Sequence, residues 1–164
     1  MVSIRPIKIE DMIQIKECNV VCLPENYTFK YYYYHYLNWP DLLFVAEDRQ
    51  TKKIVGYVMA KIDDEEDFND NLIRGHITSL AVRREYRRLG IAKRLMDATH
   101  KAMVTVFDVD AVTLNVRESN KAALGLYNVK LEYDILKVDK GYYLDGESAY
   151  LMQKKLESGY PDID

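Results

Sequence analysis

Apolar residues recur along the chain with two periods, one typical of helices and one typical of strands. The helical period, together with its turn and cap signals, predicts about four helices, which cover residues 10–22, 28–37, 91–107 and 118–127. In the first helix it places four residues on one side, Met12, Ile15, Cys18 and Cys22. In the third helix it relates Leu95, Ala98, Ala102 and Val106. Pro24 closes the first helix, and Ser119 or Asn120 caps the fourth.

Alternating apolar and polar residues predict strands between these helices. The strands cover residues 2–6, 42–48, 54–63, 72–82, 111–117, 132–138 and 148–156. The resulting order, β-α-α-β-β-β-α-β-α-β-β, predicts an α/β fold, with a mixed twisted sheet of about seven strands and about four helices on both faces.

Length and charge limit the function further. A chain of 164 residues corresponds to one domain, which we assign to residues 1–156, with a short tail over residues 157–164. The net charge of -3 provides no overall cationic field, so neither direct nucleic-acid binding nor membrane binding is expected. The chain has no stretch of about 18 uncharged apolar residues, and its first residues are too charged for a secretory signal, so we expect a cytoplasmic protein.

Two clusters of potential metal ligands are more simply explained as structural. Cys18 and Cys22 stand alone, without a second cysteine pair to complete a zinc site, so we interpret them as buried thiols and keep metal or redox roles as the alternative. Residues 63–70 are strongly acidic and are interpreted as a solvated connecting loop, with an acidic-partner or metal role as the alternative. We therefore predict no metal.

The segment RRLGIA, residues 87–92, lies where a predicted strand leads into a predicted helix. The first amides of a helix are unpaired and carry partial positive charge, which favours a phosphate. Gly90 lets a ligand approach the backbone, Ala92 keeps the first turn slim, and Arg87 and Arg88 add planar donors. The site suits a pyrophosphate. From the spacing alone, a glycine turn with two solvated arginines remains equally open, because neither a GxGxxG fingerprint nor a P-loop is present.

This segment resembles motif A of the GNAT acetyltransferases, Arg/Gln-x-x-Gly-x-Gly/Ala, which cradles the pyrophosphate of acetyl-CoA. Other stretches resemble the family of catalytic subunits of the NatA complex, which acetylates protein N-termini as they leave the ribosome; these are CNVVCLPENY, GHITSLAV, NVRESNKAALGLY and KGYYLDGESAYLM. The similarity runs from Ile4 to about Leu156. The chain lacks the extended tail of the longer animal subunits, so no function of such a tail is expected here.

The resemblance implies a GNAT fold that binds acetyl-CoA as cosubstrate. It implies a bulge in the strand Ile77–Val82, whose main chain pairs with the pantetheine arm and polarises the acetyl oxygen. It assigns cofactor binding to Leu80, Ala81, Val82, Arg87, Arg88, Leu89, Gly90, Ile91, Ala92, Asn120 and Tyr127. Tyr127 would also return a proton to the departing thiolate, and a tyrosine packed under the sheet is its structural alternative.

The resemblance also implies the residues that receive the amine. Catalytic roles fall to Glu25, Tyr143, Tyr127 and Arg117, and substrate binding to Leu23, Pro24, Glu25, Tyr27, Tyr142 and Tyr143. An α-amino group has a pKa of about 7.7 to 8.0, so Glu25 needs to act only as a mild base, directly or through water. Its bulk would exclude a first side chain as long as methionine. A simple surface glutamate is the alternative, and His76 is interpreted as a core or supporting histidine.

An aromatic run predicts a partner. Tyr31, Tyr32, Tyr33, Tyr34 and Tyr36 cover more than one face of their predicted helix. Tyrosine is enriched at protein interfaces, although a helix that is part core and part surface remains the alternative. In the NatA family the first two helices dock inside a large helical-repeat (TPR-type) auxiliary subunit. The resemblance therefore implies such a partner, the ribosome through it, and nascent-chain N-termini as substrates.

The sequence thus predicts a protein N-terminal α-acetyltransferase. It would act on small first residues (Ser, Ala, Thr, Gly) by direct attack of the amine on acetyl-CoA. Two alternatives remain open, which are acetylation of lysine side chains or small amines on the same fold, and an inactive CoA-binding scaffold.

Overall fold

The computed structural model describes residues 1–63, 68 and 70–157. Most of the acidic stretch 63–70, and all but the first residue of the tail 157–164, lie outside these residues, so the structure does not test the interpretation of either segment. None of the described helices is long and apolar enough to cross a membrane.

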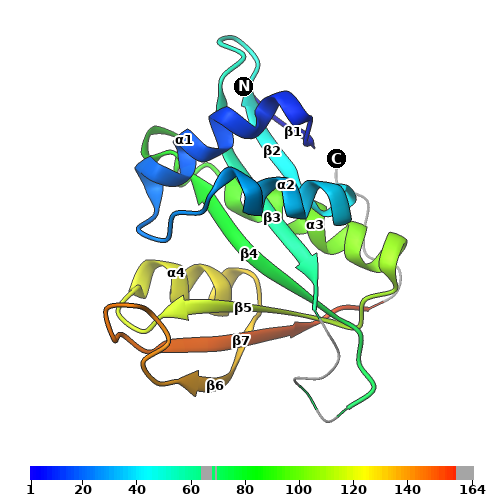
Figure 1. The fold of residues 1–164 in the computed structure, drawn as a ribbon, viewed down its shortest axis with the longest axis vertical. Coiled ribbons are helices and arrows are strands. Elements are labelled where there is room, and N and C mark those ends of the chain that lie inside the picture. The colour runs from blue at the N-terminus through cyan, green and yellow to red at the C-terminus, as the bar shows by residue number, and fades with distance from the viewer. Residues whose placement is uncertain (64–67, 69, 158–164) are drawn as a thin grey trace.

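Seven strands form one mixed sheet in the order β1-β2-β3-β4-β5-β7-β6 (Figure 1). Their bounds are β1 Val2–Pro6, β2 Phe44–Asp48, β3 Ile54–Ile62, β4 Arg74–Val82, β5 Ala111–Arg117, β6 Asp134–Asp139 and β7 Ala149–Lys155. Only β4 and β5 pair in parallel; the other neighbouring strands are antiparallel. This arrangement follows from the connections, because the parallel pair is the one joined through a long helix.

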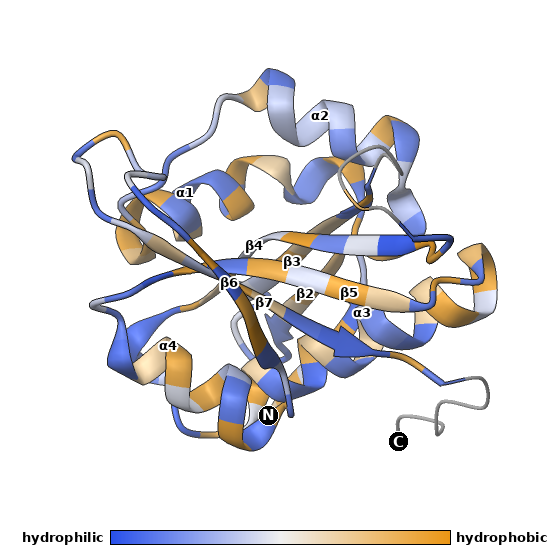
Figure 2. Ribbon diagram, turned by 90° about the horizontal axis from the view of Figure 1, so that it is seen from below, coloured by the Kyte–Doolittle hydropathy of each residue, from blue (hydrophilic) through white to orange (hydrophobic). Residues whose placement is uncertain are grey.

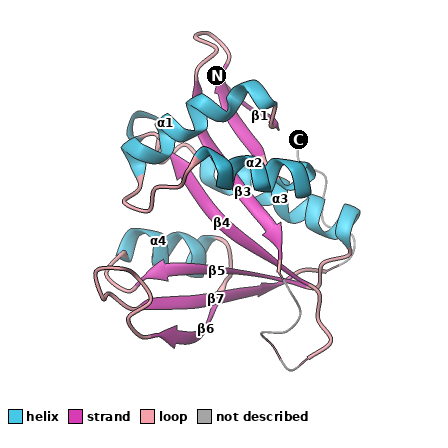
Figure 3. Cartoon of the chain, viewed as in Figure 1, coloured by secondary structure: helices cyan, strands magenta, loops and turns pink. Residues whose placement is uncertain are grey.

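The helices cover both faces of the sheet. They are α1 Met12–Cys22, α2 Phe29–Asn38, α3 Ile91–Phe107 and α4 Lys121–Gly125. Short 3-10 turns lie at Ile9–Asp11, Pro40–Leu42 and Arg84–Tyr86, and α4 continues into a π-helical turn at Leu126–Lys130. Figures 2 and 3 show α1 and α2 on one face, with α3 and α4 on the other. The predicted order of elements and the predicted seven-stranded α/β architecture are confirmed.

The sheet opens between β4 and β5. These strands pair only where Arg74–His76 meets Ala111–Thr113, and beyond that seam they diverge (Figure 1). On the other side of β4, Met59 pairs with Ser79 and Ala60 pairs with Ile77, which leaves Thr78 as an extra residue. The implied bulge in β4 is therefore present, and the main chain of β4 after the seam faces a gap instead of a partner strand.

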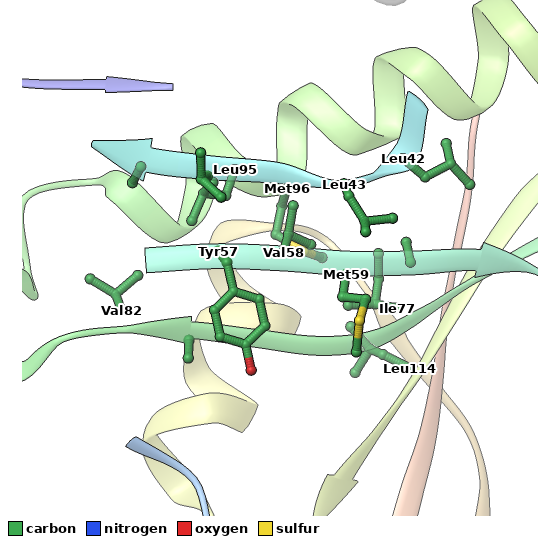
Figure 4. Close-up of a cluster of buried hydrophobic side chains, with 14 of the residues drawn as sticks. Leu42, Leu43, Tyr57, Val58, Met59, Ile77, Val82, Leu95, Met96 and Leu114 are labelled. Carbon is green, nitrogen blue, oxygen red and sulfur yellow. The ribbon is translucent and has the colours of Figure 1, made fainter. Parts of the chain in front are cut away.

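The core packs on both faces of the sheet, with Leu95 and Met96 of α3 on one face (Figure 4) and Met12 of α1 on the other. The predicted stripe on α3 is partly wrong, because Val106 is 53% exposed whereas Met103 is fully buried. The apolar period misses this face because two of its buried positions are polar. Thr99 Oγ1 donates to the Leu42 carbonyl at 2.9 Å, and His100 Nε2 lies 2.6 Å from the Tyr133 hydroxyl.

The two helices on the other face differ in how well they follow the sequence pattern. In α1 the predicted stripe is buried at Met12, Ile15 and Cys18. The interpretation of both cysteines as buried thiols is wrong for Cys22, which is only partly buried because it lies at the end of the helix, with its sulfur 4.0 Å from that of Cys18. In α2 the five tyrosines are not equivalent. Tyr32 is fully buried, which removes it from any contact surface; Tyr33 and Tyr34 are exposed, and Tyr31 and Tyr36 are partly buried.

Candidate active site

A cavity of about 420 Å³ lies in the gap between β4 and β5. Besides the two strands, the loop after α1, the β6–β7 connection and α4 contribute residues to its lining. Ten of the residues that the resemblance assigned to the site line it: Leu23, Pro24, Glu25, Tyr27, Leu80, Arg117, Asn120, Tyr127, Tyr142 and Tyr143. Residues far apart in the sequence therefore meet in one place.

The loop that carries Glu25 is held in a defined shape. It begins where α1 ends at Cys22, because Leu23 adopts an extended conformation and Pro24 cannot continue a helix. The Asn26 side-chain amide donates to the Leu23 carbonyl at 3.1 Å and to the Pro24 carbonyl at 2.8 Å. These bonds turn the loop so that Glu25 lines the cavity.

The carboxylate of Glu25 is bound by Arg117, the last residue of β5. Arg117 Nε donates to Glu25 Oε1 at 2.6 Å, while no hydrogen bond from the described residues reaches Glu25 Oε2. The guanidinium also lies 4.0 Å from the centre of the Tyr143 ring, a cation–π geometry. The hydrogen bond that Arg117 donates to Glu25 is the main cause that raises the pKa of Arg117, so the guanidinium is charged at any physiological pH.

The same guanidinium faces two further carboxylates. Arg117 Nη1 donates to Asp145 at 2.8 Å and to Glu147 at 2.9 Å. The pKa of Asp145 is lowered chiefly by the backbone N–H of Glu147, and the pKa of Glu147 is lowered chiefly by the Ser119 hydroxyl. Three carboxylates against one guanidinium leave this wall negative, which attracts a cationic amine.

The tyrosines of the site are neutral hydrogen-bonding groups. Burial raises the pKa of Tyr143 to about 12, and it raises the pKa values of Tyr27 and Tyr127 as well. Each phenol therefore keeps its proton at neutral pH. The Tyr27 hydroxyl donates to the Thr78 carbonyl at 3.4 Å, and the Tyr142 hydroxyl accepts from Asn115 at 3.1 Å. The aromatic wall is thus tied to both diverging strands.

Several lining residues were not assigned from the sequence. They are Cys22, Tyr31, Lys61, His76, Ile77, Thr78, Ser79, Leu114, Asn115, Val116 and Ala123. His76 was interpreted as a core or supporting histidine; it is partly exposed and lines the cavity, which fits a supporting residue, and its Nδ1 lies 2.9 Å from Thr113 Oγ1. Burial lowers the pKa of His76 to about 4. The ring is therefore neutral at pH 7, and its 3.9 Å approach to Asp63 is not an ion pair.

Most of these residues carry no local signal that could have identified them. Thr78 and Ser79 reach the cavity because a bulge shifts β4 by one residue. Lys61 and Asn115 belong to strands whose neighbours become known only with the sheet order. His76 offered a usable signal, since it stands in the stretch GHITSLAV that carried the resemblance.

The predicted phosphate end lies at the start of α3, outside the cavity lining. Gly90 has a φ of 78° and precedes the helix directly; a Cβ at this position would meet no atom within 4 Å. Arg88 also has a positive φ, 64°, which is unusual for a residue with a side chain. Ile91 is buried, whereas Leu89 is 65% exposed. The space beside Gly90 at the start of α3 is therefore open, and a phosphate bound there stays a prediction.

At the end of β4, beside the start of α3, the carbonyl of Val82 is already bonded by side chains of the protein. Arg87 Nε donates to the Val82 carbonyl at 2.9 Å, and Cys22 Sγ lies 3.6 Å from the same oxygen. Thr78 and Val82 thus both present their carbonyls to side chains at the gap. Because peptide groups alternate along a strand, those of Leu80, midway between them, face the same open edge. Within the described residues, no group of three or more His, Cys, Asp or Glu side chains could hold a metal ion.

Comparisons with known proteins agree on one family. The model of the acetyltransferase (GNAT) family matches residues 12–133. The chain is 50% identical to the N-terminal acetyltransferase A complex catalytic subunit NAA10 of Arabidopsis thaliana, over 96% of this chain and 79% of that protein. It is 47% identical to the corresponding subunit, ard1, of Schizosaccharomyces pombe, over 93% and 84% of the two chains. Among solved structures, the NatC complex bound to Gag peptide and CoA contains a chain with a TM-score of 0.85, 28% identity, and coverage of 95% and 99%.

Proposed function

Since the chain belongs to the GNAT acetyltransferase family, and is an acetyltransferase that uses acetyl-CoA, we propose that it acetylates the α-amines of nascent proteins as the catalytic subunit of a NatA-type complex. Its substrates would begin with small residues, Ser, Ala, Thr or Gly. The observation that carries the proposal is the Glu25 carboxylate, held by Arg117 through one oxygen, beside the open edge of β4.

The residues present fit acetyl-CoA at two separate places. Open space beside Gly90 and the unpaired first amides of α3 would receive the pyrophosphate. The unpaired main chain of β4 around Leu80 would hold the pantetheine arm, with Asn120 and Tyr127 across the gap. When bound, acetyl-CoA supplies the thioester that the amine attacks. Arg88 and the other residues of 87–92 would set its orientation.

The amine enters from the side of Glu25. A substrate N-terminus is mostly an ammonium at pH 7, and the negative wall of Glu25, Asp145 and Glu147 attracts it. Glu25 Oε2 would accept its proton, directly or through water, while Oε1 stays bound to Arg117. Tyr127 keeps its proton at neutral pH because burial raises its pKa, so it is suited to protonate the departing thiolate. Neither Cys18 nor Cys22 is needed as a nucleophile.

The same wall would set substrate preference. Leu23, Pro24, Glu25 and Tyr27 line the cavity together with Tyr142 and Tyr143. A short first side chain fits beside Glu25, whereas methionine would have to displace the anchored loop. Tyr142 and Tyr143 would hydrogen-bond the peptide backbone.

Replacement of Glu25 tests this function. We expect Glu25→Gln to lower kcat/KM for a Ser- or Ala-starting peptide by about 100-fold, because the amide cannot accept the proton. Calorimetry should find the affinity for acetyl-CoA unchanged. Glu17→Gln, on the exposed face of α1, is the matched control and should keep full activity. Turnover that survives Glu25→Gln would contradict the proposal.

A peptide panel separates the alternatives. Free α-amines beside internal lysines and small polyamines should be compared in one assay, with Ser, Ala, Thr, Gly and Met as first residues. Preferred acetylation of lysine would favour the side-chain alternative. Inactivity of the chain, even with its auxiliary subunit, would favour a CoA-binding scaffold.

The partner would dock on the face formed by α1 and α2. Exposed apolar residues gather there, namely Ile13, Val20, Val21, Phe29, Tyr33, Tyr34 and Leu37. We propose that a helical-repeat auxiliary subunit covers this face in the cytoplasm and links the enzyme to the ribosome. Leu37→Glu, at a side chain that is 77% exposed, should abolish copurification with a co-expressed subunit. Val129→Glu, at a similarly exposed side chain in the turn that continues α4, should not.

A further inference from the structure

A buried chain of hydrogen bonds runs from the Glu25 loop to β4. Asn19 Nδ2 donates to the Glu25 carbonyl at 3.0 Å and to the Tyr57 hydroxyl at 3.0 Å. The Tyr57 hydroxyl in turn lies 2.6 Å from Ser79 Oγ. Asn19 and Tyr57 are fully buried and Ser79 is 6% exposed. We propose that Asn19, Tyr57 and Ser79 are positioning residues, which fix the backbone of Glu25 relative to the bulged strand β4.

The donors and acceptors admit one arrangement at the loop. Both hydrogens of the Asn19 amide nitrogen are used, one by Glu25 and one by Tyr57. The Tyr57 oxygen accepts from Asn19, so its own hydrogen is free to point at Ser79. Turning the Asn19 amide over would place its oxygen against the Glu25 carbonyl, two acceptors facing each other. The bond to Glu25 therefore fixes the orientation of Asn19, and Asn19 fixes the loop.

The chain of bonds is poorly explained by stability alone. Asn19 Oδ1 is buried and has no hydrogen-bond partner among the described residues. An unpaired buried oxygen destabilises the folded state, and an apolar residue of the same shape would avoid that penalty. What an apolar residue could not do is hold a backbone carbonyl in place. The unpaired oxygen therefore points to a positional role for Asn19.

Glu25 is consequently fixed at two points by residues from two different elements. Arg117, on β5, holds its carboxylate at 2.6 Å, while Asn19, on α1, holds its carbonyl at 3.0 Å. If the second contact is lost, the loop can pivot around Arg117, and Oε2 loses its direction toward the substrate amine. This inference rests on the proposed role of Glu25. It predicts a defect on the amine side of the reaction and none on the acetyl-CoA side.

Two substitutions remove the contacts while keeping the packing. Tyr57→Phe deletes the hydroxyl, and Asn19→Leu replaces the amide by an apolar group of similar shape. Each should lower kcat/KM for the peptide about tenfold while leaving the KM for acetyl-CoA unchanged. The double variant should be no worse than the more severe single variant, because both act through one chain of bonds.

The matched control is Tyr133→Phe. Tyr133 is also fully buried, and its hydroxyl is also 2.6 Å from its partner, His100, in the core behind α3. We expect Tyr133→Phe to lower the melting temperature at least as much as Tyr57→Phe, with no change in peptide kinetics. Equal kinetic effects of the two Tyr→Phe substitutions would overturn the proposal, since the defect would then follow stability alone.

A readout without substrate separates this inference from the proposed function. Amide hydrogen exchange over residues 23–27 should be faster in Tyr57→Phe and Asn19→Leu than in the wild type, and unchanged in Tyr133→Phe. Unchanged exchange in the first two variants would overturn the positioning role, whatever the activity. If exchange changes but the wild type acetylates no α-amine, the positioning role stands and the proposed function fails.

Discussion

At the scale of single residues, Gly90 has a left-handed backbone conformation and open space beside it, and a substitution can test the two features separately. Its φ of 78° lies in the left-handed region, which residues with a Cβ adopt at a cost of about 1 to 2 kcal/mol. The position where its Cβ would stand is open, with no protein atom within 4 Å. The backbone conformation affects the stability of the fold, whereas the open space affects the binding of a ligand.

Asparagine distinguishes the two features at this position. Gly90→Asn should cost less than about 1 kcal/mol of unfolding free energy, because asparagine tolerates left-handed backbone. It should nevertheless weaken acetyl-CoA binding about tenfold or more, since its side chain occupies the open space at the first turn of α3. Denaturant titration and calorimetry measure the two effects. Unchanged cofactor affinity would show that no ligand approaches the backbone here.

At the scale of elements, α4 is short and begins at a side-chain cap. It has five residues, Lys121–Gly125, before the π-helical turn begins, and none of its side chains is fully buried. The Asn120 side-chain oxygen accepts from the Ala123 N–H at 3.1 Å. The Asn120 nitrogen is not used by this cap, and the residue lines the cavity. One side chain can thus start the helix and still donate to a ligand.

Aspartate keeps the capping oxygen and loses the donor. We expect Asn120→Asp to leave the melting temperature nearly unchanged while raising the KM for acetyl-CoA several-fold. Asn120→Ala loses both functions and should in addition lower the unfolding free energy by about 1 kcal/mol. If the aspartate and wild-type enzymes have equal KM values, Asn120 is a cap and nothing more.

The elements themselves could be predicted from the sequence, because their periods are regular. The helix predicted over residues 91–107 has those bounds in the structure, and Asn120 is one of the two caps that the sequence proposed. The buried face of α3 was harder to predict, since Thr99 and His100 are buried through hydrogen bonds to distant partners. Tyr32 and Tyr33 are neighbours of the same type, and only packing decides that one is buried and the other exposed.

At the scale of the whole molecule, buried histidines link stability to pH. His35 and His100 are fully buried, and burial lowers the pKa of His35 from 6.5 to about 4 and that of His100 to about 3. Each ring is therefore neutral in the folded protein, where it holds hydrogen bonds to Thr78 and Tyr133 respectively. The unfolded chain binds protons at higher pH than the folded chain, so acid favours unfolding.

The stabilisation of the folded state by the neutral rings of His35 and His100 is complete above pH 6.5 and is lost as the pH falls toward 4. Between pH 7 and pH 5 each of these histidines should lower the unfolding free energy by up to about 2 kcal/mol. Denaturant titrations at the two pH values measure this change. Because glutamine does not titrate, His100→Gln should reduce the difference in unfolding free energy between pH 7 and pH 5 by about the contribution of one histidine. An identical difference in both proteins would refute the assignment.

The candidate site was harder to predict from the sequence than the fold. Motif A can be recognised in the sequence from Gly90 and its neighbours, and the loop of Glu25 can be recognised from the stretch LPENY. The contact between Glu25 and Arg117 joins residues 92 positions apart, and neither position carries a local sign of the other. The hydrogen bonds that link Asn19, Tyr57 and Ser79 depend on a bulge at Thr78, which only the pairing of β3 with β4 reveals.

The short seam between β4 and β5 has a mechanical consequence. Among the described residues, strand pairing between the two halves of the sheet is limited to three residue pairs, Arg74–His76 against Ala111–Thr113. Because the pairing is so short, we expect the angle between β4 and β5 to change more readily than the geometry of strands that are paired along their whole length. Ligands that bridge the two strands would stiffen that angle, and the rate at which they leave would follow the flexing of the seam.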